Sequence, residues 1–184
     1  DLAYDIQRDF VHVTLLAEVP FMLAVYPKVP ARTLQELIAF ARARPGQVNF
    51  ASPGIGSPSH LASELFAQSA DLKLTHVPYK GTAPAMLDLV AGRVQPYFTS
   101  IPGALAHVRA GRIRALAVTS ARRVASMPEV PTMRESGLED YRANSWYGIA
   151  FPRGVPANVV KRVGGIVQKA LSEGGLEPLF AEQG

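Results

Sequence analysis

Cysteine is absent from this chain of 184 residues. Its absence excludes disulfide bonds, thiolate catalysis and cysteine-ligated metal sites, and it leaves the redox compartment undetermined. Long hydrophobic runs are absent too, because no stretch approaches the roughly 20 uninterrupted apolar residues that a membrane-spanning helix needs. Charged residues make up only 18% of the chain, and there are only 4 histidines to supply a general base.

The net charge is small and positive. Nineteen Lys and Arg residues against 15 Asp and Glu residues give +4 at pH 7. The densest basic stretches, RIRALAVTSARR and ARARP, are too dilute for a nucleic-acid-binding surface and lack an aromatic platform. We therefore expect a mildly basic solvated surface, no nucleic-acid partner, and a preference for anionic small molecules in any cleft.

Hydrophobic residues alternate between short apolar strands and segments of helical period. The strands are expected in PFMLAVYP, QVNFAS, LKLTHVPY, RVQPYFTS, RIRALAVTS and NSWYGIAFP, with helices between most of them. Thr33 with Glu36 predicts a helix start, whereas Gly92 and Gly111 predict helix ends. VPTMRESG predicts a further short helix. This alternation predicts an α/β fold, in which helices cover both faces of a mostly parallel sheet.

The loop ASPGIGSPSH joins a predicted strand to a predicted helix and is richer in glycine and serine than a connector requires. Gly54 and Gly56 permit close approach of a ligand to the backbone amides, and Ser52 adds a hydroxyl group. Ser57 is a plausible N-cap before Pro58, and a helix start of this kind favours a carboxylate or phosphate. A plain turn followed by a capped helix explains the same residues equally well.

Two further loops have the same character. Lys80, Gly81 and Thr82 precede the next predicted helix, and Thr99 with Ser100 ends the strand RVQPYFTS. Because the carboxyl ends of parallel strands meet at one edge of a sheet, the three loops together predict a polar rim that is compatible with an anion.

Catalytic and cofactor motifs are weak by comparison. The loop G-x-G lacks a third glycine and there is no G-K-[ST], so nucleotide binding is not supported. No G-x-S-x-G elbow supplies a nucleophilic serine, and no histidine is expected beside a serine in such an elbow. His60 could cap its helix, contact a ligand or pack, whereas His76 is expected to be structural. Asp88 is expected at the surface, and Trp146 in core or hinge packing.

Six stretches now identify a known family. They are YDIQRDF, ASPGIGSPSHLASELF, HVPYKGTAPAMLDLVAGRV, AGRIRALAVTS, MPEVPTMRESGL and NSWYGIAFPRGVP. In order and spacing they resemble the extracytoplasmic solute receptors of the tripartite tricarboxylate transporters, also called the Bug family, over essentially the whole chain. The resemblance implies a periplasmic binding protein whose two α/β lobes close around a small carboxylate and pass it to membrane permease subunits.

The resemblance also implies where the ligand binds and what is not needed. Its loop positions correspond here to Ser52, Gly54, Ile55, Gly56, Ser57, His60, Lys80, Gly81, Thr82, Thr99 and Ser100. We expect no catalytic residue, no cofactor and no metal. The family often has aspartates where this chain has Gln95 and Thr99, so we expect a ligand without a positively charged amine.

The family pattern further implies that part of the first lobe is missing. Residues 21–144 are expected to form one complete second lobe, whereas residues 1–20 and 145–184 are remnants of the first lobe and its hinge. The chain starts at Asp1 without a signal peptide, so we expect its first residues to have been removed. The remnants should be disordered, packed on the intact lobe, or paired with a second copy in a homodimer.

Two other functions stay open from the sequence. One is a hydrolase or transferase that uses the serine-rich loop on an anionic substrate. The other is a ligand sensor that docks on a membrane kinase, which the residues do not distinguish from a transport receptor.

Overall fold

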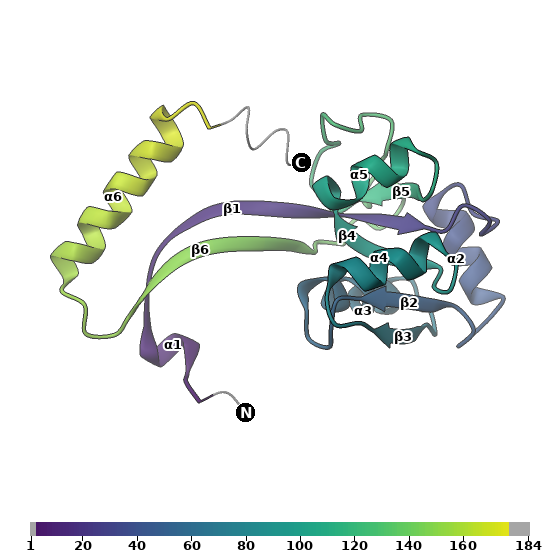
Figure 1. Ribbon diagram of the computed structural model, residues 1–184, viewed down its shortest axis with the longest axis horizontal. Helices are drawn as coiled ribbons and strands as arrows, with labels where there is room; N and C mark the ends of the chain where they lie inside the picture. Colours follow the sequence, from purple (N-terminus) through teal and green to yellow (C-terminus); the bar gives the residue numbers. More distant parts are fainter. Residues whose placement is uncertain (1–2, 177–184) are drawn as a thin grey trace. The chain divides into compact units, whose positions relative to one another are not determined.

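The computed structural model of this chain describes residues 3–176 (Figure 1). In chain order the elements are α1 (Ile6–Asp9), β1 (Phe10–Val25), α2 (Leu34–Arg42), β2 (Asn49–Ser52), α3 (Pro58–Ser69), β3 (Thr75–Pro78), α4 (Thr82–Val90), β4 (Pro96–Ser100), α5 (Ile101–Arg109), β5 (Arg114–Val118), β6 (Asn144–Pro152) and α6 (Ala157–Glu173). The outermost positions of the predicted segments 1–20 and 145–184, namely 1–2 and 177–184, lie outside the described residues.

The described chain divides into two compact units. The first contains residues 3–18 and 146–176, and the second contains residues 19–145. In the first unit β6 pairs with β1. Helix α6 lies close to β1 at Gly164, where an added Cβ would lie 3.3 Å from Cγ1 of Val13. The glycine that weakens α6 as a helix former therefore permits its close contact with the strand.

The second unit contains a sheet with the strand order β3-β2-β4-β1-β5. Strand β2 is parallel to β3 and to β4. Strand β1 is antiparallel to β4 and to β5. Four of these five strands therefore run in one direction and β1 runs against them, which confirms the predicted mostly parallel α/β sheet.

Two hydrophobic clusters, one on each face of this sheet, hold the second unit together. Alternate residues of β1 enter each cluster, because side chains of a strand point to opposite faces in turn. Leu23 joins the cluster that contains Leu37 of α2 and Phe66 of α3. Met22 joins the cluster that contains Leu89 of α4 and Ile101 of α5. The sheet is therefore doubly wound, as predicted.

The local start and stop signals explain most helix ends. The Thr33 hydroxyl accepts a hydrogen bond from the N–H of Glu36 at the start of α2. Gly92 and Gly111 follow α4 and α5 with φ angles of 75° and 66°, a conformation that favours glycine. These three predictions are confirmed.

One predicted helix does not form. The segment VPTMRESG contains turns, although Thr132 and Glu135 exchange the expected hydrogen bonds, of 2.8 and 3.0 Å. Val118 donates to the carbonyl of Pro131 and accepts from the N–H of Met133, which attaches the start of the segment to the sheet. The segment forms one turn, in which the N–H of Ser136 donates to the carbonyl of Thr132 at 3.0 Å, and Gly137 follows with a φ of 90° and ends it.

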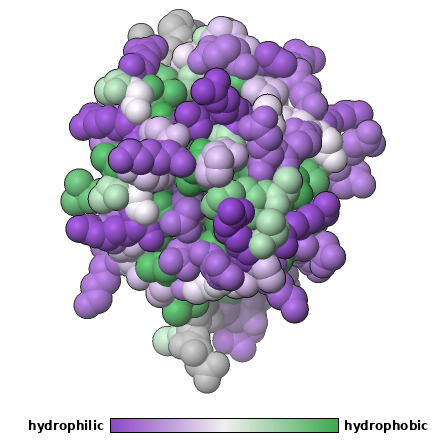
Figure 2. Space-filling view, turned by 90° about the vertical axis from the view of Figure 1, so that its right-hand side faces the viewer, coloured by the Kyte–Doolittle hydropathy of each residue, from purple (hydrophilic) through white to green (hydrophobic). Residues whose placement is uncertain are grey.

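The surface is mixed in character. Figure 2 shows hydrophilic side chains over most of one face, with hydrophobic side chains in small groups between them. Among the helices of residues 3–176, none has the length and apolar character required to cross a membrane.

Candidate functional site

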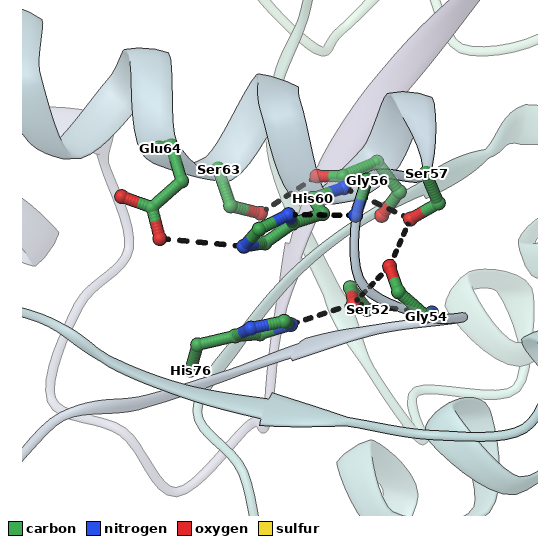
Figure 3. Close-up of polar contacts among 9 residues, drawn as sticks. Ser52, Gly54, Gly56, Ser57, His60, Ser63, Glu64 and His76 are labelled. Atoms are coloured by element: carbon green, nitrogen blue, oxygen red, sulfur yellow. Dashed lines mark hydrogen bonds and ion pairs between the residues drawn. The ribbon is translucent and has the colours of Figure 1, made fainter. Parts of the chain in front are cut away.

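The loop between β2 and α3 is held in shape by its own serines (Figure 3). Ser52 ends β2, and its Oγ bonds to both the carbonyl and the N–H of Gly54, at 3.0 and 3.2 Å. Ser57 Oγ donates to the same carbonyl at 2.7 Å and accepts from the N–H of His60 at 3.3 Å. Ser57 is therefore the N-cap of α3, as predicted. The φ angles of Gly54 and Gly56, 153° and 77°, favour glycine.

The loop between β3 and α4 is bonded directly to this first loop. The N–H of Tyr79 donates to the carbonyl of Ser52 at 2.9 Å, and the N–H of Gly81 donates to the carbonyl of Pro53 at 3.0 Å. Gly81 is the N-cap of α4 and offers no capping side chain. The first amide N–H groups of α4, beginning with Thr82, lack an intrahelical partner and can donate hydrogen bonds to an anion. Thr82 and Lys80 are exposed.

The third loop is very short, because α5 begins directly after β4. Ser100 is the N-cap of α5 but makes no side-chain capping bond. Thr99 is buried, and its Oγ1 has no hydrogen-bond partner within the described residues. Tyr97 is also buried, and burial raises the pKa of its phenol.

All three loops lie at one edge of the sheet. Ser52 pairs with Pro78 in the parallel β2–β3 ladder, and Ala51 pairs with Tyr97 in the parallel β2–β4 ladder. The carboxyl ends of β2, β3 and β4 therefore meet, and the N-termini of α3, α4 and α5 follow them. We call this edge, made by residues 52–57, 79–82 and 99–100, the anion rim.

Not every predicted ligand residue offers its side chain to the anion rim. Ile55 is 80% exposed, whereas Ser52 is fully buried and already bonded. The His60 ring bonds through Nδ1 to the N–H of Gly56 at 3.1 Å. The roles of all eleven predicted residues in ligand binding stay a prediction.

A serine–histidine pair is present that the sequence did not reveal. Ser52 Oγ lies 2.7 Å from Nε2 of His76, although Ser52 lies in no G-x-S-x-G elbow of the kind considered from the sequence. The two residues lie 24 positions apart and meet because β2 pairs with β3. Ser52 is 0% exposed, and a nucleophile must reach its substrate. The pair therefore supports a structural role, as expected for His76.

Asp88 has a definite structural role that the sequence analysis missed. Its carboxylate accepts hydrogen bonds from the Tyr79 hydroxyl at 2.7 Å and from Arg93 at 2.6 Å. These two bonds hold the pKa of Asp88 below its usual value. Burial, with Asp88 as a second cause, raises the pKa of Tyr79 to about 12. The network holds Tyr79 in place at the anion rim. The spacing Y-x8-D-x4-R is the feature of the sequence from which this network could have been predicted.

Gln95 lies away from the anion rim, contrary to the sequence comparison that placed it in the pocket. It immediately precedes β4, and its Oε1 accepts a hydrogen bond from the N–H of Asn49 at 2.8 Å. Asn49 begins β2, so Gln95 lies at the opposite edge of the sheet. Of these two positions, only Thr99, at the carboxyl end of β4, lies where its lack of charge can affect which ligand binds.

A cavity of about 440 Å³ lies in the first unit, at none of the predicted ligand residues. Its lining is mostly apolar and includes Phe10, Leu15 and Trp146. Trp146 is 66% exposed, so it is not a core residue, and its expected role in hinge packing stays a prediction. Strand β6 has no buried residue.

Among residues 3–176, no group of three or more His, Asp or Glu side chains is arranged to hold a metal ion.

The doubly wound α/β sheet with helix N-termini gathered at one edge is the fold of periplasmic-binding-protein-like structures, among them periplasmic binding protein BugD, with a TM-score of 0.77 at 32% identity. The family is more specific. The sequence model of the tripartite tricarboxylate transporter family receptor matches residues 1–184, and the chain belongs to that family.

Individual relatives agree with this assignment. Protein BugT of Bordetella pertussis is 36% identical over 183 residues, which is 100% of this chain and 56% of BugT. The structure of R. palustris Rpa4515 with adipate has a TM-score of 0.87 at 35% identity and covers 100% of this chain and 62% of that one. MatC (Rpa3494) from Rhodopseudomonas palustris with bound malate has a TM-score of 0.84 at 31% identity and covers 99% of this chain and 62% of that one. The chain thus spans about half the length of the curated relatives it matches.

Proposed function

We propose that this chain is the ligand-holding part of an extracytoplasmic solute receptor in the periplasm. The receptor binds a small organic carboxylate without changing it chemically and delivers it to the membrane permease subunits of a tripartite tricarboxylate transporter. One observation carries this proposal: three helix N-termini follow the carboxyl ends of three adjacent strands at the anion rim. Family membership supports it, as do the adipate and malate in two solved relatives.

The chemistry of the anion rim favours a carboxylate. Gly81 and Ser100 leave the first amides of α4 and α5 without a side-chain cap. Helix N-termini carry partial positive charge, which favours a negative ligand. We assign ligand contact to these amides and to the hydroxyl of Thr82, with Lys80 adding positive charge beside them. The Ser57 hydroxyl already donates to the carbonyl of Gly54, so it shapes the β2–α3 loop instead. Ser52, Gly54, Ile55, Gly56 and His60 shape the loop that carries them.

The ligand should lack a charged amine. The segments 52–57, 79–82 and 99–100 contain no Asp or Glu. An ammonium group at the anion rim would therefore find no carboxylate from these segments, and the same helix N-termini would repel it. This reasoning depends on Thr99 and not on Gln95.

We also propose that the receptor has two lobes. Residues 21–144 would be one complete lobe, and residues 1–20 with 145–184 would belong to the other. The exposed apolar lining of the cavity in the first unit supports this assignment, because sheets of this class are normally covered on both faces. A second copy of the chain in a homodimer is the alternative cover for that surface.

The serine–histidine pair gives one specific reason to test catalysis. Ser52 Oγ and His76 Nε2 are close enough for proton transfer, as in a hydrolase, but Ser52 is buried. We expect no turnover of small esters by the protein. A measurable rate that disappears in Ser52→Ala would favour the hydrolase. A sensor that docks on a membrane kinase would use the same ligand site.

Calorimetry with adipate, malate and aspartate tests the proposed function. We expect the two dicarboxylates to bind and aspartate to bind more weakly, because its ammonium group lacks a partner. Thermal unfolding gives an independent readout, since a ligand at 100 times its Kd stabilises the folded state by about 2.7 kcal/mol. Tight binding of aspartate or glutamate, with no response to the dicarboxylates, would refute the proposed ligand preference.

A further inference from the structure

Two histidines and a phenylalanine form a continuous stack behind the β2–α3 loop. The rings of His60 and His76 lie 4.0 Å apart, centroid to centroid, with an interplanar angle of 19°. The rings of His76 and Phe50 lie 4.7 Å apart, with an angle of 15°. The three residues come from α3, β3 and β2, so the stack joins three elements under one loop.

Each histidine bonds to a different end of the loop (Figure 3). His60 Nδ1 accepts the N–H of Gly56 at 3.1 Å, and His76 Nε2 bonds to Ser52 Oγ at 2.7 Å. Because Nδ1 of His60 accepts a hydrogen bond, the proton of the neutral ring lies on Nε2, which faces Oε1 of Glu64 at 3.5 Å.

We propose that His60 is a positioning residue, which holds the loop 52–57 in its ligand-binding shape only while its ring is neutral, so that carboxylate binding weakens in acid. The proposal rests on the proposed function for its ligand, but the loop change itself does not need a ligand. His60 then acts through Gly56 and not by touching the carboxylate.

The added proton has one position to occupy on His60. Since Nε2 already carries a proton, protonation places the second one on Nδ1, where it faces the N–H of Gly56. Two donors then oppose each other, the Gly56 hydrogen bond is lost, and this end of the loop is released. The half-exposed carboxylate of Glu64, beside Nε2, stabilises the charged ring.

The charged groups around the stack affect the protonation of the two histidine rings. Glu64 faces it from α3, whereas Phe50 and Ser52 of β2 and the loop residues 53–57 carry no ionisable side chain. Burial lowers the pKa of His76, and the charge of His60 lowers it further, while Glu64 opposes these effects. Two charged rings 4.0 Å apart repel each other. A proton on one ring therefore hinders the addition of a second proton to the other ring.

The first test follows the ligand-free protein by NMR between pH 5 and 8. We expect the amide signal of Gly56 to move with the titration of the His60 ring. In His60→Asn the amide oxygen replaces Nδ1 as acceptor without titrating, so the Gly56 signal should stay constant. His12→Asn, in the first unit, is the matched control and should retain the wild-type behaviour of Gly56. A Gly56 signal that ignores the titration of His60 overturns the proposal.

The second test measures the Kd of adipate over the same pH range in wild type and His60→Asn. Protonation of adipate itself affects both proteins equally, so the ratio of the two Kd values isolates the histidine. We expect wild type to weaken relative to the variant by up to about tenfold per pH unit below the His60 titration. A relative gain of wild-type affinity in acid would show direct contact between His60 and the ligand and would overturn the proposal.

The two tests separate this inference from the proposed function. If the Gly56 signal follows His60 while adipate binds at no pH, the proposed function fails and the loop mechanism stands. If adipate binds with the same pH dependence in both proteins, the proposed function stands and the positioning role is refuted.

Discussion

Thr82 offers a way to change the charge of the anion rim without weakening the fold. It is the first residue of α4, it is exposed, and the N-cap before it supplies no side-chain bond. Thr82→Asp places a negative charge at a helix N-terminus, which stabilises a helix by about 0.3–1 kcal/mol. Thr82→Asn is the matched control, since it has nearly the same shape and no charge. We expect the aspartate variant to unfold at a temperature about 1–4 °C higher than the asparagine variant.

Ligand affinity should change in the opposite direction. A carboxylate ligand about 4 Å from the new charge is repelled by about 1 kcal/mol in water and by about 4 kcal/mol near a protein surface. The expected loss of affinity for adipate, relative to Thr82→Asn, therefore lies between about 5-fold and about 1,000-fold. Calorimetry gives the affinity and thermal unfolding without ligand gives the stability. If adipate binds both variants equally, no carboxylate binds near the start of α4 and the assignment of the anion rim is wrong.

Three further predictions concern other parts of the second unit. Gly92→Ala should destabilise the protein more than Gly111→Ala. Both glycines have positive φ, but a Cβ at Gly92 would also lie 2.5 Å from the Tyr26 ring. Chemical denaturation of the two variants measures the difference. Equal losses would show that the ring moves aside. The folded protein raises the pKa of Tyr79 from 10 to about 12, so it binds the phenol proton more tightly than the unfolded chain does. The stability that this gives is complete below pH 10 and is lost as the pH rises through 12. Asp88→Asn should bring the Tyr79 titration, followed by NMR of its ring, closer to 10; an unchanged titration would show that burial alone sets it.

The sequence contained the strand–helix alternation and most of the punctuation of the fold. Ser57 and Pro58 start α3, and Gly92 and Gly111 follow α4 and α5, because these signals act through local backbone geometry. Their effect depends on a few neighbouring residues, all of which are visible in the sequence. The predicted rim of three loops follows from the same alternation, since parallel strands must end at one edge.

Contacts between distant segments were not accessible in the same way. The direction of β1 against its neighbours, the meeting of Ser52 with His76, and the bond from Asn49 to Gln95 all depend on strand register. Register is set by packing of the whole sheet and not by local sequence.

The most direct test of the central claim is an NMR titration of the amide signals with adipate. If the free backbone amides and hydroxyls of the anion rim hold the carboxylate, the largest shifts should fall on Thr82 and Ile101, the first residues of α4 and α5, and they should saturate together with one Kd. Shifts confined to the apolar cavity of the first unit, around Phe10 and Trp146, would contradict the claim.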